Sequence, residues 1–242
     1  MVRKVLTIFA HPDDAEAVAG GTLLIWSTKG WQITLCIVTD GDKGSHDPHE
    51  PVDRIVHRRR QEQEQAARRL GADLIWLGYE DGMVLPTLDL RKDLIRVIRQ
   101  VRPHVVLTHD PTVWFLHSNW INHPDHRAVG QATLEACYPA VKKASIFPDL
   151  VAAGYPPHLP EELWLAATEQ PNRWIDIQPV LEQKVQLMLC YASQFPPEAT
   201  KLLFTRFARE AGQPAGLAAA ESFRVMQLAE RTITLLVNQA PG

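Results

Sequence analysis

The sequence predicts an α/β fold built on a Rossmann-like, mostly parallel and doubly wound sheet. Strand-like and helix-like segments alternate along the first half of the chain, a pattern typical of successive parallel β/α units. Polar clusters follow three of the strand-like segments, as expected at the sheet edge where ligands bind. The chain has 242 residues, 45% of them hydrophobic, and can bury a large core. We expect a single domain over residues 1–242, less regular from about residue 143.

Hydrophobic periodicity locates the elements of the first half. An apolar run predicts a strand over residues 4–10, and a helical pattern follows over 16–28. A second apolar run predicts a buried strand over 31–39. A long helix over 52–70 closes at Gly71, a residue suited to the position after a helix. The remaining elements expected in this half are a strand at 73–77, a helix at 88–101 ended by Pro103, a strand at 104–108 and a helix at 127–140.

The second half of the chain has a weaker pattern. Prolines interrupt residues 147–160, and we expect this segment to cover the substrate or to contact another subunit. An apolar extension at residues 232–237 has no evident place in the sheet and is a candidate oligomer contact. The expected elements are strands at 162–166, 174–177 and 221–225 and helices at 180–191 and 199–209.

Charge and cysteine usage narrow the class of partner. The formal net charge is −3, so the chain has no basic field to attract nucleic acids or anionic lipids. Its N-terminal apolar run is too short for a signal peptide, and no segment reaches the roughly 18 apolar residues of a membrane span. The three cysteines are widely spaced, which is typical of reduced thiols. We expect a cytoplasmic protein that acts on a small molecule.

Residues 10–16, Ala-His-Pro-Asp-Asp-Ala-Glu, place an imidazole and three carboxylates where a buried strand ends. Charge is costly there without a metal or a partner. His11, Asp14 and His126 offer two imidazoles and one carboxylate, a ligand set that suits catalytic zinc and also ferrous iron or cobalt. The adjacent Asp13 would diverge from Asp14 and remove a proton from the bound water. His123, about one helical turn before His126, would bear on the substrate carbonyl or the leaving nitrogen.

Other polar residues fall at the same predicted edge. Asp40 follows the strand at 31–39, and His109 and Asp110 follow the strand at 104–108. We expect these three to contact substrate or to form the wall of its pocket. Glu16 is equally consistent with a site role and with an acidic residue in the first turn of a helix.

Residues 10–16 and residues 122–127, Asn-His-Pro-Asp-His-Arg, resemble the two signature motifs of the LmbE-like, or PIG-L, family of zinc-dependent N-deacetylases. The resemblance extends from about residue 3 to about residue 225. It includes Gly20-Gly21-Thr22-Leu23, Val38-Thr39-Asp40-Gly41, Arg59 with Glu62, Ala66, Leu70-Gly71, Lys184 and Ser193-Gln194.

The resemblance implies the family's fold and the removal of acetyl from an N-acetylglucosamine unit. It implies that His11, Asp14 and His126 bind zinc and that Asp13 is the general base. His123 would stabilise the oxyanion or protonate the amine.

The resemblance also implies roles for residues around these. Asp125 would orient or charge-balance His123, and Arg59 would shape the substrate pocket with Glu62 holding it in place. Similar proteins assemble into trimers or hexamers, so we expect a homo-oligomer.

Three other functions remain open at this point. An amidase acting on another N-acyl amine, such as a sugar–thiol conjugate, would use the same residues with a different pocket. A Rossmann-like nucleotide-binding protein would fit the alternating elements, but residues 11–14 replace the glycine-rich loop and their carboxylates would repel a pyrophosphate. A non-catalytic metal module would not need Asp13 or His123.

Overall fold

The computed structural model describes residues 2–116 and 120–228. Its main strands are β1 (Lys4–Phe9), β2 (Gln32–Thr39), β3 (Asp73–Tyr79), β4 (Val105–His109), β7 (Glu162–Ala166), β8 (Arg173–Asp176) and β9 (Ala220–Gln227). Its α-helices are α1 (Asp14–Thr28), α2 (Val52–Leu70), α3 (Leu88–Val101), α4 (Pro124–Cys137), α5 (Pro148–Ala152), α6 (Leu181–Met188) and α7 (Pro197–Gly212). Short 3₁₀ helices occupy Ala140–Lys142, Gln178–Val180 and Gln213–Ala215.

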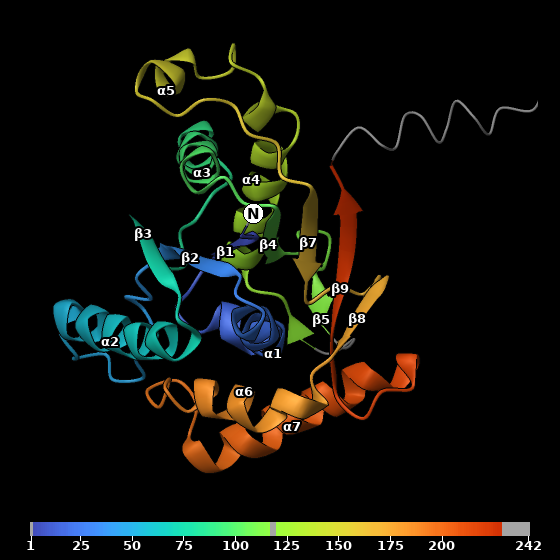
Figure 1. Cartoon of the computed structure of the whole chain (residues 1–242). Helices are drawn as coiled ribbons and strands as arrows, with labels where there is room; N and C mark the ends of the chain where they lie inside the picture. Colours follow the sequence, from blue (N-terminus) through green and yellow to red (C-terminus); the bar gives the residue numbers. More distant parts are fainter. Residues whose placement is uncertain (1, 117–119, 229–242) are drawn as a thin grey trace, which may run out of the picture.

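The main strands form one seven-stranded sheet in the order β3-β2-β1-β4-β7-β9-β8. The first five of these are mutually parallel, whereas β9 runs antiparallel to β7 and to β8. Helices α3 and α4 cover one face, and α1, α2, α6 and α7 lie on the other (Figure 1). The predicted mostly parallel, doubly wound sheet is therefore confirmed. The chain winds outward from β1 to β3 and then returns to β4, so β1 and β4 meet at the switch point where such sheets bind ligands.

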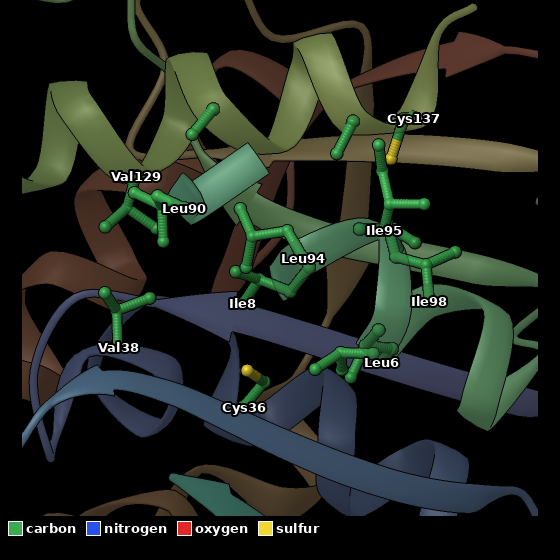
Figure 2. Close-up of a cluster of buried hydrophobic side chains, with 14 of the residues drawn as sticks. Leu6, Ile8, Cys36, Val38, Leu90, Leu94, Ile95, Ile98, Val129 and Cys137 are labelled. Atoms are coloured by element: carbon green, nitrogen blue, oxygen red, sulfur yellow. The ribbon is translucent and has the colours of Figure 1, made fainter. Parts of the chain in front are cut away.

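Strand β1 is buried on both faces, since successive side chains of a strand point in opposite directions. Leu6 and Ile8 join a cluster with Leu94 of α3 (Figure 2). Val5 and Phe9 belong to the cluster on the opposite face, and all four β1 side chains are at most 1% exposed. This double burial explains the near-continuous apolar sequence that precedes the polar cluster.

The helix expected at 127–140 is the largest misplacement of an element. Helix α4 begins at Pro124 and ends at Cys137, because proline fits the first turn of a helix and Pro139 cannot continue it. The pattern also missed α5 inside the proline-rich segment and a two-stranded hairpin of β5 (Phe115–Leu116) and β6 (Trp120–Ile121). The apolar extension at 232–237 lies outside the described residues.

The structure also bears on the predictions for the cysteines and for membrane-spanning segments. All three cysteines are buried and free, as their spacing predicted. Among the described residues, no helix combines the length and the apolar character needed to cross a membrane.

A buried ion pair ties the C-terminal part of the chain to α1. Lys184 Nζ lies 2.5 Å from Glu221 Oε1 and donates to the Ala17 carbonyl at 2.9 Å. The Glu221 carboxylate also accepts the backbone N–H groups of Gly21 (2.9 Å) and Thr22 (2.7 Å). Helix α1 begins at Asp14, so α6 and β9 fix the helix that follows the polar cluster.

We expect Lys184→Met to destabilise the fold by about 3–5 kcal/mol, since it leaves the buried Glu221 carboxylate without its cation. Urea unfolding measures the change. The matched control is Lys201→Met on the exposed side of α7, for which we expect a change within about 0.5 kcal/mol. Equal stability of the two variants would contradict a structural role for the pair.

Candidate metal centre

The polar clusters predicted from the sequence come together at the carboxyl edge of the sheet. Strands β1 and β4 are paired up to Ile8 and Thr108, so the residues that follow them lie side by side. His11 and Asp14 follow β1, His109 ends β4, and the start of α4 brings His126 to the same place. The result is a compact group of imidazoles and carboxylates.

Three of these side chains have the geometry of metal ligands. His11 Nδ1 lies 3.3 Å from His126 Nε2 and 3.4 Å from Asp14 Oδ2, and His126 Nε2 lies 3.2 Å from Asp14 Oδ1. Ligand atoms of a tetrahedral zinc site, at their usual bond lengths, are about 3.3 Å apart. Three overlapping groups have ligand atoms within 4.8 Å of one another: His11 with His123 and His126, Asp14 with His109 and His126, and His11 with Asp81 and Asp125. The donor set therefore fits a divalent metal.

The electrostatics of this cluster favour bound positive charge. Burial lowers the pKa of His11, but the carboxylates of Asp125, Asp14 and Asp81 outweigh it and raise that pKa well above its usual value. Burial raises the pKa of Asp14, yet His126 and His109 hold it well below its usual value. A buried carboxylate that stays ionised is a ready metal ligand.

The candidate ligands are oriented by a second set of residues. His11 Nε2 lies 3.0 Å from Asp81 Oδ1 and 3.3 Å from Asp125 Oδ2. His126 Nδ1 lies 3.2 Å from Asn122 Oδ1. Such partners fix which ring nitrogen of a histidine faces the metal.

Two findings here differ from the sequence expectations. The Asp125 carboxylate hydrogen-bonds His11 and the N–H groups of Gly82 (2.7 Å) and Val84 (3.2 Å), so its hydrogen-bond partners are not His123; its negative charge still acts to raise the pKa of His123. Sequence reasoning missed Asp81, which is 7% exposed. Its only signal was an Asp-Gly pair after the strand predicted at 73–77, the same signal that drew attention to Asp40.

Asp13 sits beside the ligands in a strained backbone conformation, with φ 100° and ψ −30°. Its Oδ2 accepts hydrogen bonds from Arg59 Nη1 (3.0 Å) and Nη2 (3.1 Å), and Arg59 Nη2 also donates to the Pro12 carbonyl. Burial raises the pKa of Asp13 to about 6, even though Arg59 lowers it. Asp13 is therefore a shielded carboxylate with a fixed direction.

The surroundings of Arg59 explain its position. Gly41 has φ 65°, and a Cβ there would lie 2.8 Å from Arg59 Nε. The expected partner Glu62 does not hold Arg59, because its carboxylate instead accepts the Ser193 N–H (2.8 Å) and hydroxyl (2.7 Å). Arg59 thus reaches Asp13 through a gap that only glycine leaves open.

His123 is the N-cap of α4 and is exposed. Its Nδ1 accepts the backbone N–H of Asp125 at 3.2 Å. Burial of part of the ring, together with His11 and His126, lowers its pKa. A neutral ring that accepts at Nδ1 carries its proton on Nε2, so His123 can donate a hydrogen bond from that atom.

The three residues predicted to contact substrate, His109, Asp110 and Asp40, have different surroundings in the structure. His109 joins the cluster: its ring stacks on His126 at 4.0 Å, and burial lowers its pKa to about 3. Asp110 accepts the Thr112 and Thr168 hydroxyls at 2.6 Å each. Asp40 forms a two-nitrogen pair with Arg60. The carboxylates of Asp110 and Asp40 are therefore engaged by neighbours other than His11, Asp14 and His126.

Glu16 is fully buried, although its sequence position also fits a solvated first turn. Its Oε1 accepts a hydrogen bond from Gln63 Nε2 at 2.8 Å. Burial raises the pKa of Glu16 from 4.5 to about 7. When folding raises the pKa of an acid, that acid lowers the free energy of unfolding as the pH rises from the unfolded-state pKa to the folded-state pKa.

Glu16→Gln changes the free energy of unfolding of the metal-free protein. We expect this change to be more favourable at pH 8 than at pH 5, by about 2 to 3 kcal/mol. The amide does not ionise, whereas the wild-type carboxyl must do so inside the protein as the pH passes from 4.5 to about 7. Urea unfolding at both pH values measures the difference. The same change at both would contradict the raised pKa.

The sequence and the fold resemble those of known deacetylases. The sequence profile of the PIG-L family, described as GlcNAc-PI de-N-acetylase, matches residues 6–137. A diacetylchitobiose deacetylase from Thermococcus kodakarensis is 34% identical over 202 residues, which are 83% of this chain and 73% of that protein. A mycothiol S-conjugate amidase from Streptomyces coelicolor is 28% identical, over 55% of this chain and 48% of its own length. The structure of N,N'-diacetylchitobiose deacetylase from Pyrococcus horikoshii superimposes with a TM-score of 0.86 at 30% identity, covering 93% of this chain and 84% of that one.

Proposed function

The chain belongs to the PIG-L family of GlcNAc-PI de-N-acetylases, and from this membership we propose that it is a zinc-dependent hydrolase that removes acetyl from a small molecule containing N-acetylglucosamine. The observation that carries the proposal is the triangle of His11, Asp14 and His126 with the Asp13 carboxylate held beside it. Two imidazoles and one carboxylate leave a tetrahedral metal one position open, as catalytic zinc requires.

In this proposal His11 Nδ1, His126 Nε2 and the Asp14 carboxylate hold the metal. When bound, the metal supplies a Lewis acid and lowers the pKa of water, which makes water a nucleophile near neutral pH. Two imidazoles and one carboxylate suit zinc, and the same set also accepts ferrous iron or cobalt.

Asp13 accepts a proton from the water that attacks the acetyl carbonyl carbon, and it later returns that proton to the departing amine nitrogen. Its fixed direction and its pKa of about 6 suit both steps. His123 donates a hydrogen bond from Nε2 to the carbonyl oxygen as that oxygen gains negative charge. The C–N bond then breaks, and the products are acetate and a free amine.

The other predicted site residues hold or pack against the proposed base and the proposed metal ligands. Arg59 holds the Asp13 carboxylate, and Asp125 and Asp81 fix His11. His109 packs behind His126. Substrate contact by Asp40, His109 and Asp110 stays a prediction from their position at the strand ends, as does assembly into a trimer or hexamer.

We propose an amino sugar as substrate because the relatives are named for such substrates. An amidase acting on a sugar–thiol conjugate is the second candidate, favoured by the similarity to a mycothiol S-conjugate amidase. A nucleotide-binding function is disfavoured, since Asp13 and Asp14 occupy the turn after β1 where a pyrophosphate would lie.

We expect His11→Ala and Asp14→Ala to lose the metal, because each removes one of only three protein ligands. Asp13→Ala should keep the metal and lose most turnover, since loss of a general base costs about 10²–10⁴-fold in rate. Elemental analysis of each purified variant, paired with an assay, measures both properties. A His11→Ala, Asp14→Ala double variant that retains stoichiometric metal would rule out this ligand assignment.

The substrate proposal is tested by measuring acetate release from N-acetylglucosamine and N,N'-diacetylchitobiose, with and without a chelator. We expect acetate and amine in equal amounts, abolished by the chelator and restored by added zinc. A mycothiol S-conjugate serves as the comparison substrate. Cleavage of that conjugate with no acetate from either sugar would favour the amidase instead.

A further inference from the structure

We propose that Gln63, held by Glu16, is a positioning residue that fixes the backbone of Asp13 and so aims its carboxylate. This inference rests on the proposed role of Asp13 as the base. It assigns a task to Glu16 and Gln63, two buried polar residues that lie outside the proposed set of metal ligands.

The backbone of Asp13 needs an external restraint. Its φ of 100° lies in a region that favours glycine, and such a conformation costs about 1–3 kcal/mol in other residues. The Asp13 N–H donates to Gln63 Oε1 at 3.2 Å, and its carbonyl accepts the N–H of Ala17 in the first turn of α1 at 2.9 Å. The hydrogen bond from the N–H therefore connects the strained residue to α2.

The orientation of the Gln63 amide is set by both of its partners. A backbone N–H can only donate, so the amide must present Oε1 to Asp13. Its Nε2 then points the other way and donates to Glu16 Oε1 at 2.8 Å. Gln63 is 1% exposed and Glu16 is fully buried, so water does not replace either bond.

Helix α2 holds both the side chain and the backbone of Asp13. Arg59 and Gln63 are four residues apart and so lie on one face of the helix. Arg59 binds the Asp13 carboxylate, and Gln63 binds the Asp13 N–H. With both ends held, the carboxylate has one direction relative to the metal-ligand triangle.

We expect Gln63→Met to lower kcat about 10- to 100-fold, because a displacement near 1 Å can cost that much in rate. KM and zinc affinity should change little, since the metal ligands are not altered. The melting temperature should fall by a few degrees, because the buried Glu16 carboxyl and the Asp13 N–H each lose a hydrogen-bond partner. The matched control is Gln65→Met on the same helix, where the side chain is exposed, and it should match wild type. A loss that follows lost metal, or no loss at all, would overturn the inference.

Exchanging the two side chains gives a sharper test. The single substitution Gln63→Glu places a carboxyl group at position 63 against the carboxyl group of Glu16, and we expect it to lower kcat. With Glu16→Gln added, the new amide at position 16 can donate to the new carboxylate at position 63, which accepts the Asp13 N–H. We expect the double variant to recover to within about threefold of wild type, a coupling typical of residues in direct contact. A double variant that keeps metal and melting temperature but stays as slow as Gln63→Glu would contradict the proposal.

Crystal structures of the wild type and of Gln63→Met separate this inference from the proposed function. If the wild type releases no acetate or amine, the proposed function fails. The two crystal structures test the positioning role of Gln63 independently of any activity. Departure of Asp13 from its φ near 100° in the variant supports it, and an unchanged Asp13 overturns it.

Discussion

Buried negative charge around one imidazole is the constraint on which the rest of the site depends. The carboxylates of Asp14, Asp81 and Asp125 all approach His11, each with a side chain at most 10% exposed. Carboxylates at this depth are costly unless positive charge or N–H donors meet them. The fold supplies donors from the backbone of Gly82 and Val84, and the proposed metal would supply the remaining charge.

The winding of the sheet makes this concentration of charge possible. Because β1 and β4 are neighbours while their connections run to opposite faces of the sheet, the turns that follow them lie at the switch point where such sheets bind ligands. The side chains of the site are held by different segments of the fold. Helix α4 carries His126, the turn after β3 carries Asp81, and α2 reaches Asp13 through Arg59. Two of these segments are also joined to each other, because the Asp125 carboxylate at the start of α4 accepts the N–H groups of Gly82 and Val84 after β3.

The sequence predicted most of the sheet and the gathering of His11, Asp14 and His126 at its edge, since long periodic segments and short polar motifs both carry local signals. It could not predict the β5–β6 hairpin, because strands of two residues have no periodicity. The hydrogen-bond partner of the Asp125 carboxylate was not predictable, for a different reason. Asp125 and His123 are near neighbours in sequence, but the turn of α4 directs the carboxylate to His11. Asp81 meets His11 across 70 positions of chain, a contact that only tertiary structure creates.

The antiparallel strand β9 has a consequence for synthesis of the protein. The chain emerges from the ribosome with its N-terminus first, and domains fold as units. Glu221 on β9 and Lys184 on α6 complete the hydrogen bonding of α1 at Gly21 and Thr22. A nascent chain that has exposed only residues 1–137 therefore contains both histidine motifs without the contacts that secure α1. The contacts of Lys184 and Glu221 with α1 accordingly form only after β9 has left the ribosome, well after both histidine motifs have done so.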